Sequence, residues 1–218
     1  MNPLVSCLCP TYNRREFISR SLQYFRQQDY PNLELIILDD GEDCVKDLIP
    51  CDSRIRYLYE VPRKNHGQKI NRCMELANGE YGIVWDEDDY YSPDRITKQI
   101  TPMLNDPKIV VTGTSRLYYY VHGTKQAYEY FNWTNKEWIG AIAFRKSIWK
   151  LHPFKEVPHG GDFSFIHEIP RLQWLDLKDR ELVVCSIHGD NAAPKNTSSP
   201  SFSEESWETI EKITKGSL

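Results

Sequence analysis

The sequence lacks the features that mark several classes of protein. It contains no run of about 18 apolar residues, which excludes a membrane-spanning helix. Residues 1–7 have neither the charged nor the apolar segment of a secretory signal. The net charge of −4 gives no overall attraction for nucleic acid, so nucleic acid is not indicated as a partner. Together these absences predict a cytoplasmic protein.

The six cysteines are not spaced for a metal site or a disulfide framework. No Cys-x-x-Cys pair occurs, and no cysteine lies at the spacing from histidine that is typical of zinc fingers. Cys7 and Cys9 alternate along one strand-like segment, and the other four are scattered. In a cytosolic protein such thiols are reduced, and we expect them to act as small apolar residues.

What the chain does contain is an alternation of apolar strands and amphipathic helices over its first half. Strands are predicted at 4–9, 33–38, 54–59 and 81–85, and helices at 14–28, 66–77 and 93–104. This order predicts an α/β domain built on a mainly parallel sheet that helices cover on both faces.

The second half of the chain has a different composition. It is rich in aromatic residues, and strands are predicted at 109–112, 115–121, 126–131 and 182–187. Residues 192–203 are rich in Ser, Pro and Asn, which predicts a mobile loop or lid. The sequence shows no internal repeat and no boundary of a second domain, so we expect a single domain over 1–218.

Polar segments follow three of the predicted strands. They are Pro10–Asn13, Asp39–Gly41 and Asp86–Asp89. In sheets of this kind, ligands bind at the carboxyl ends of the strands. The three segments therefore predict one shared ligand site.

The acidic segment after the fourth strand is the most informative of the three. Asp86, Asp88 and Asp89 place like charges close together, and such charges repel one another unless a cation compensates them. Carboxylate oxygens favour Mg²⁺ or Mn²⁺, which could in turn hold the phosphates of a nucleotide. The alternative is a solvated acidic turn ahead of the helix that begins near Pro93.

This combination of motifs resembles the family 2 glycosyltransferases, which adopt the GT-A fold. The matching segments are 5–14, 35–41, 69–71, 77–81, 86–89 and 93–95, in the order that the family has them. The second half matches only through Gly161-Asp162 and His188. The resemblance implies transfer of a sugar from a nucleotide diphosphate donor to a hydroxyl-bearing acceptor, such as a glycan, with inversion at the anomeric carbon.

The resemblance also implies an architecture. The sheet would be mainly parallel and Rossmann-like, flanked by helices, with a smaller acceptor-side β elaboration in the second half. The nucleotide-sugar-binding half would span about 1–105 and the acceptor-binding half about 106–191. The remaining residues, about 192–218, would form a flexible or lid-like tail.

Carried over to this sequence, the family's donor site assigns a role to each of the strand ends. Pro10, Thr11 and Tyr12 would line the base and ribose. Asp40 would accept a hydrogen bond from the base, most often uracil in this family, and Lys69 could contact the diphosphate. The alternative for Asp40 is a simple turn over 39–41.

The family's Asp-x-Asp pair corresponds to Asp86 and Asp88. Asp86 would lie on the donor, Asp88 would be the direct metal ligand, and Asp89 would bind the metal or orient what does. His188 could complete the coordination of Mn²⁺ or Mg²⁺, although a lone histidine after a strand can also be structural or exposed. The bound cation would neutralise the leaving diphosphate.

Inverting transfer needs a base that takes the proton of the acceptor hydroxyl. By resemblance that base is Asp162, with Glu168 second, and the alternative for Asp162 is the N-cap of a helix. Trp133 and Trp138 are candidates for stacking on the acceptor sugar, although packing in the core is the commoner fate of tryptophan.

Other functions are also compatible with parts of the pattern. A sugar-nucleotide nucleotidyltransferase would need a glycine-rich, basic loop after the first strand, and Pro10–Asn13 is not one. A non-catalytic nucleotide-sugar binding module is a further alternative. The family's processive members carry Gln-x-x-Arg-Trp, whereas residues 171–174 read Arg-Leu-Gln-Trp, so we expect single sugar addition. The lysines at 146, 150 and 155 fit an anionic acceptor or a solvated helix face equally well.

Overall fold

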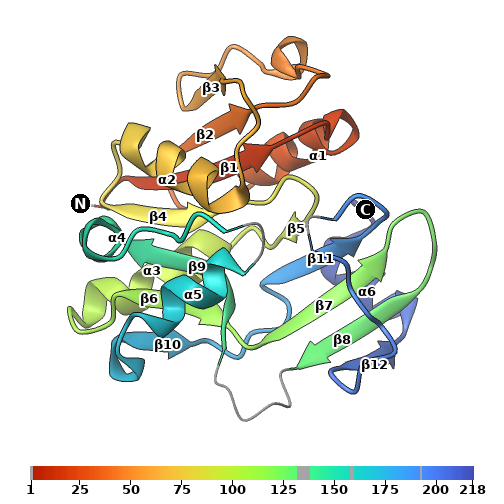
Figure 1. Cartoon of the computed structure of the whole chain (residues 1–218). Coiled ribbons are helices and arrows are strands. Elements are labelled where there is room, and N and C mark those ends of the chain that lie inside the picture. The colour runs from red at the N-terminus through yellow and green to blue at the C-terminus, as the bar shows by residue number, and fades with distance from the viewer. Residues whose placement is uncertain (1, 132–137, 158–159, 192) are drawn as a thin grey trace.

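Two β-sheets form the framework of the chain (Figure 1). The computed structural model describes residues 2–131, 138–157, 160–191 and 193–218. The larger sheet has seven strands in the order β10-β6-β9-β4-β1-β2-β3. These strands are β1 (Val5–Thr11), β2 (Leu33–Asp39), β3 (Ile55–Tyr59), β4 (Tyr81–Val84), β6 (Val111–Thr114), β9 (Gly140–Arg145) and β10 (Trp174–Asp176).

The larger sheet is parallel except at one strand. β9 runs antiparallel to both of its neighbours, β4 and β6, while the pairs β1–β2, β1–β4, β2–β3 and β6–β10 are parallel. The prediction of a mainly parallel sheet is therefore confirmed. Because the carboxyl ends of β1, β2 and β4 lie at one edge, the polar segments that follow them meet there.

Helices cover both faces of the larger sheet. The helices are α1 (Arg15–Arg26), α2 (His66–Leu76), α3 (Arg95–Asn105), α4 (Lys146–Leu151), α5 (Gly161–His167) and α6 (Trp207–Thr214), with short 3₁₀ turns at Lys46–Leu48 and Arg171–Gln173. Successive side chains of β1 point to opposite faces, so Cys7 packs in one core with Ile18 of α1, while Leu8 packs in the other with Ile70 of α2. In Figure 1, α2, α4 and α5 lie together on the near face of this sheet.

The smaller sheet has five strands in the order β12-β8-β7-β11-β5. They are β5 (Tyr90–Tyr91), β7 (Arg116–Val121), β8 (Ala127–Phe131), β11 (Val183–Ile187) and β12 (Phe202–Glu205). This sheet is the β elaboration expected in the second half. Its edge strand β5 begins directly after Asp89, so the acidic segment 86–89 connects the two sheets.

The C-terminal part of the chain differs from the prediction of a flexible or lid-like tail. Phe202 to Glu205 form β12, which pairs antiparallel with β8, and α6 follows. Ser206 caps α6 by accepting a hydrogen bond from the Thr209 amide at 3.2 Å, and Ile210 is fully buried. The polar composition of the tail hid these few apolar residues. The longest described stretch of the tail without helix or strand is 193–201, ahead of β12.

Several predicted boundaries also move by a residue or two. The first helix begins at Arg15 rather than Arg14, the third at Arg95 rather than Pro93, and the strand expected at 109–112 lies at 111–114. Helix and strand ends are the positions that local patterns locate least well. Within the described part of the chain, no helix is both long enough and apolar enough to cross a membrane.

Candidate functional site

The candidate site lies where β1, β2 and β4 end. Pro10 is a buried residue of β1, and Thr11, the last residue of that strand, donates a hydrogen bond from its hydroxyl to Glu87 at 3.2 Å. The backbone amide of Asp40 donates to the Thr11 carbonyl at 3.4 Å. These contacts tie the three strand ends together, as the sequence predicts.

Asp40 and Lys69 form a buried ion pair beneath the site. The Lys69 ammonium lies 2.8 Å from one Asp40 oxygen and 3.0 Å from the Thr11 carbonyl oxygen, and the Lys64 amide donates to the other Asp40 oxygen at 2.6 Å. The Asp40 side chain is 0% exposed. Lys69 thus neutralises Asp40. The predicted contacts of these residues with base and diphosphate would require this arrangement to open, and they stay predictions.

Arg63 occupies the face of Tyr12. The central carbon of its guanidinium lies 3.7 Å from the centre of the Tyr12 ring, a close cation–π stack. Arg63 is exposed and belongs to the loop between β3 and α2, next to Lys64. The flat guanidinium covers the aromatic surface on which a base could stack.

Asp88 and His188 come together from positions 100 residues apart, as the resemblance implies. His188 Nε2 lies 2.8 Å from Asp88 Oδ2, and Arg14 lies 2.9 Å from His188 Nδ1. The pairing of β11 with β5 brings His188 to the acidic segment, and the ring of Phe17 packs on it at 4.9 Å between centroids. The Asp88 and His188 side chains are 15% and 8% exposed.

Asp89 points away from Asp88 toward β11. It accepts a hydrogen bond from the Ser186 amide at 2.8 Å. Burial, and then the charges of Asp88 and Asp86, raise the pKa of Asp89 well above its usual range. Of the two predicted roles of Asp89, this geometry favours orienting the segment over binding a metal directly.

The environment of the neighbouring Glu87 also favours the neutral form of its carboxyl group. Burial, followed by the charge of Asp88, raises its pKa to about 8, although Arg14 lies 3.7 Å away. Among the residues that the structure describes, no three His, Cys, Asp or Glu side chains converge on one metal position. Asp88 and His188 still offer an oxygen and a nitrogen ligand suited to Mn²⁺, and phosphate oxygens and water usually fill the other positions around such ions. The donor set therefore fits a divalent cation bound together with a diphosphate.

Asp86 forms an ion pair with His66, and the charge of Asp162 acts on both. His66 Nε2 is 3.5 Å from Asp86 Oδ1. Burial opposes protonation of His66, but its hydrogen bond with Asp86 and the charges of Asp86 and Asp162 raise its pKa to about 9. Burial also works against ionisation of Asp86, yet the hydrogen bond and the charge of His66 lower the pKa of that carboxyl below its usual value.

Asp162 has a carboxylate oxygen that the fold leaves without a partner among the described residues. Its Oδ1 is buried and has no hydrogen bond within the described part of the chain. Burial raises the pKa of Asp162, and the charge of His66 limits the rise. The alternative, that Asp162 caps a helix, is wrong: the N-cap of α5 is Gly160, with a left-handed φ of 76°, and no side chain caps it.

The rival base candidate is engaged elsewhere. Glu168 lies 2.8 Å from the Lys155 ammonium and 3.6 Å from His152. The segment that leads into α5 approaches the site through a close backbone contact with α2. A Cβ on Gly67 of α2 would lie 2.1 Å from the Lys155 carbonyl oxygen. Only glycine at position 67 lets the start of α2 pack against the segment that leads into α5.

Sequence reasoning missed three cations of this site. Arg14 contacts His188, His66 contacts Asp86, and Arg63 covers Tyr12. The available signal was position: Arg14 follows β1, and His66 follows β3 as the first residue of α2. Both therefore lie at the edge where the carboxyl ends of the strands meet.

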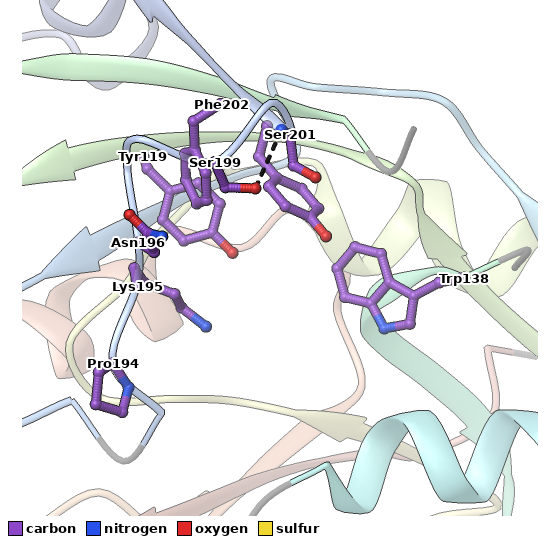
Figure 2. Close-up of a pocket in the computed structure, with 9 residues that line it drawn as sticks. Tyr119, Trp138, Pro194, Lys195, Asn196, Ser199, Ser201 and Phe202 are labelled. Atoms are coloured by element: carbon purple, nitrogen blue, oxygen red, sulfur yellow. Dashed lines mark hydrogen bonds between the residues drawn. The ribbon is translucent and has the colours of Figure 1, made fainter. Parts of the chain in front are cut away.

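The two predicted acceptor residues have different outcomes. Trp133 lies outside the described residues. Trp138 is half-buried and lines a cavity of about 280 Å³ between the smaller sheet and the segment 194–201 (Figure 2). Trp138 therefore packs against the core with part of its ring and borders open space with the rest.

Comparison with known proteins identifies the family. The model of the family described as "Glycosyl transferase family 2" matches residues 6–160. The chain belongs to this family. It is 32% identical over 107 residues to the putative teichuronic acid biosynthesis glycosyltransferase TuaG of Bacillus subtilis, over 47% of this chain and 42% of that protein. It is also 32% identical over 106 residues to the UDP-Glc:alpha-D-GlcNAc-diphosphoundecaprenol beta-1,3-glucosyltransferase WfgD of Escherichia coli, over 47% of this chain and 42% of that protein. The chain thus spans less than half the length of these relatives.

Solved structures show the same fold over most of the chain. Staphylococcus aureus TarS (residues 1–349, with UDP-GlcNAc) matches with a TM-score of 0.70 and 17% identity, over 90% of this chain and 62% of that one. The mannosyltransferase PcManGT of Pyrobaculum calidifontis, solved with GDP-Man and Mn²⁺, matches with a TM-score of 0.68 and 18% identity, over 88% and 59%. The fold of this family 2 chain is therefore of the GT-A type, as predicted.

Proposed function

We propose that this family 2 chain transfers a single sugar, with inversion, from a nucleotide diphosphate donor to an acceptor hydroxyl, with a divalent cation. The observation that carries the proposal is Asp162, a carboxylate with a buried, unbonded oxygen beside Asp86 and His66. A uridine nucleotide is the donor that the relatives' names support, since WfgD is named for UDP-Glc and TarS was solved with UDP-GlcNAc.

Each group at the strand ends has a role in this reaction. Tyr12, once Arg63 leaves its face, would support the base, while Asp88 and His188 would hold Mn²⁺ or Mg²⁺ against the diphosphate. When bound, the cation would neutralise the charge that develops on the leaving group. His66, which carries a positive charge at neutral pH because its pKa is about 9, would add to that neutralisation near Asp86.

Asp162 would act on the opposite side of the sugar. Its free oxygen takes the proton of the acceptor hydroxyl while the acceptor oxygen forms the new bond to the anomeric carbon. The bond from that carbon to the diphosphate breaks, and the nucleoside diphosphate leaves with the electron pair. A raised pKa suits Asp162 to this task, because a base works best when its pKa approaches the working pH.

The experiment replaces the base without changing its shape. Asp162→Asn should lower the rate of transfer by roughly 100- to 10,000-fold, while donor binding stays near that of the unaltered chain. The matched control is Glu168→Gln, which removes a carboxylate that is held by Lys155 and should leave transfer nearly unchanged. Release of nucleoside diphosphate measures transfer, and calorimetry measures donor binding. Transfer at the normal rate by Asp162→Asn would show that the base is another group.

The donor can be found first by thermal shift. Nucleotide sugars are screened with and without Mn²⁺, since a ligand that binds only the folded chain raises its melting temperature. We expect a uridine diphosphate sugar to give the largest shift, and only when Mn²⁺ is present. Absence of a metal-dependent shift with every nucleotide would overturn the proposed function as a whole.

A further inference from the structure

The cavity beside Trp138 lies outside the donor groups. Four aromatic side chains from the smaller sheet and from the start of β9 line one side of it: Tyr119, Tyr130, Trp138 and Phe202. The segment 194–201 closes the other side. Figure 2 shows the Lys195 side chain extending from that segment into the open space, with the Trp138 ring across from it. The volume, about 280 Å³, suits one sugar residue and is near the lower end of the range for small-molecule sites.

The aromatic wall has the chemistry of a sugar site and a fixed shape. Tyr130 packs edge-on against Trp138 at 5.7 Å between centroids and in a tilted contact against Phe202 at 5.0 Å, so each ring supports the next. A Cβ on Gly140 would lie 2.7 Å from the Trp138 ring, which shows how closely this ring lies on β9. Supported aromatic rings offer an apolar face at low entropic cost to the C–H face of a sugar.

Lys195 is a cation that the fold itself does not use. Its ammonium makes no hydrogen bond or ion pair with any described residue. It lies 5.9 Å from the centroid of the Tyr119 ring, and its charge also acts at longer range on Asp86, Asp162 and Cys185. The Lys195 side chain is exposed to solvent at the mouth of the cavity. An ammonium in this position is free to pair with a ligand.

The cavity adjoins the reacting groups. The Tyr119 hydroxyl contacts the Cys185 thiol, which in turn contacts Asp89. The charge of Lys195 also reaches Asp86 and Asp162, where it works to lower the pKa of both carboxyls. The Lys195 charge at the mouth of the cavity therefore acts on two of the carboxylates that the proposed reaction uses. Because carboxylates crowd this edge, an anionic sugar would be repelled from it unless a cation held the anion.

We propose that this cavity binds the acceptor and selects a saccharide that carries a negatively charged group, a carboxylate or a phosphate, through the Lys195 ammonium. This inference rests on the proposed function, because it assigns the acceptor side of the same reaction. The opposing assignment is that Lys195 serves the donor diphosphate. The two differ in which ligand a change of Lys195 affects.

The experiment measures binding without transfer. The full chain with UDP and Mn²⁺ is titrated with three probes by ligand-observed NMR: methyl β-D-glucuronide, glucose 6-phosphate and the neutral methyl β-D-glucoside. The two charged probes should bind roughly tenfold more tightly than the neutral one, the usual gain from one charged hydrogen bond. The better of the two charged probes identifies the source of the anion.

Variants of Lys195 then test the cause of this preference. Lys195→Ala should remove the preference for charged probes and leave UDP affinity unchanged, while Lys195→Arg should keep it. Lys108→Ala removes the same charge from an exposed turn before β6 and should behave like the unaltered chain. Trp138→Ala should weaken all three probes by a similar factor, because stacking does not depend on charge.

Three results would overturn the inference. They are equal binding of charged and neutral probes, no binding of any probe by the unaltered chain, and a Lys195→Ala variant that loses UDP affinity with its probe preference intact. The proposed function fails separately, through the absence of nucleotide binding or through normal transfer by Asp162→Asn. Failure of the acceptor assignment therefore cannot be mistaken for failure of the reaction.

Discussion

The two sheets meet at one site but bring different chemistry to it. The seven-stranded sheet contributes paired charged groups: Asp40 with Lys69, which are buried, and Asp86 with His66, which are partly exposed. The five-stranded sheet contributes aromatic rings and an open cavity with Lys195 at its mouth. In this molecule, neighbouring side chains fix the charges of the ionisable groups on the larger sheet. The aromatic surface suited to a sugar lies open on the smaller sheet.

The largest expected effect is on the segment between the sheets. Asp88→Asn should remove the strengthening of UDP binding by Mn²⁺, a loss of roughly 10- to 100-fold, because it replaces the proposed oxygen ligand, which lies 2.8 Å from His188. Calorimetric titration of UDP in Mn²⁺ and in EDTA measures the change.

A change of charge on the five-stranded sheet is the matched control. Glu204→Gln lies on β12 and should keep the full effect of Mn²⁺ on UDP binding. If Mn²⁺ still strengthened UDP binding by Asp88→Asn, the metal would bind elsewhere. The proposed difference between the two sheets would then be wrong.

A smaller effect concerns His66 and pH. The pKa of His66 is raised from its usual 6.5 to about 9, so its contribution to stability is fully present below pH 6.5 and is lost as the pH rises through 9. Between pH 7 and about 10, the unaltered chain should lose on the order of 2 kcal/mol more stability than His66→Gln. Urea unfolding at the two pH values measures the difference.

His122 on the five-stranded sheet provides the comparison for His66. Its side chain is 38% exposed, and among the described residues its acidic partner is a Glu16 oxygen at 3.9 Å. His122→Gln should therefore lose stability with pH in parallel with the unaltered chain. An equal response to pH from the His66 and His122 variants would show that the Asp86 contact does not stabilise the fold.

The smallest expected effect compares two helix caps. Asn65 caps α2 through a reciprocal pair of hydrogen bonds with Gln68, and Ser206 caps α6. Asn65→Ala and Ser206→Ala should each lower the free energy of unfolding by about 1 kcal/mol. Only Asn65→Ala should also weaken UDP binding, since α2 carries His66 and Lys69 into the site. Urea unfolding and UDP titration of both variants test this, and equal UDP affinities would contradict it.

The sequence alone predicts the parts of this molecule that depend on local pattern. The apolar runs of β1, β2 and β4 and the polar segments that follow them are visible in a single chain, and they locate the site. The pairing of Asp88 with His188 came only through the family resemblance, because no local pattern joins residues so far apart. The sequence did not predict that Arg63 stacks on Tyr12, or that Lys69 and the Lys64 amide occupy both oxygens of Asp40. Both features depend on how the loop between β3 and α2 packs. β12 and α6 were missed because few apolar residues mark them in a polar stretch.

The segment 86–89 is held at both of its ends. Before it, the Trp85 amide donates to Leu8 of β1, and after it, the Tyr91 hydroxyl of β5 bonds both the amide and the carbonyl of Asp86. Asp89 in addition is fixed to β11 of the smaller sheet. The alignment of the two sheets therefore sets the spacing of these carboxylates; the four residues of the segment do not set it by themselves. A slight rotation of one sheet against the other would therefore change the distance between Asp88 and His188.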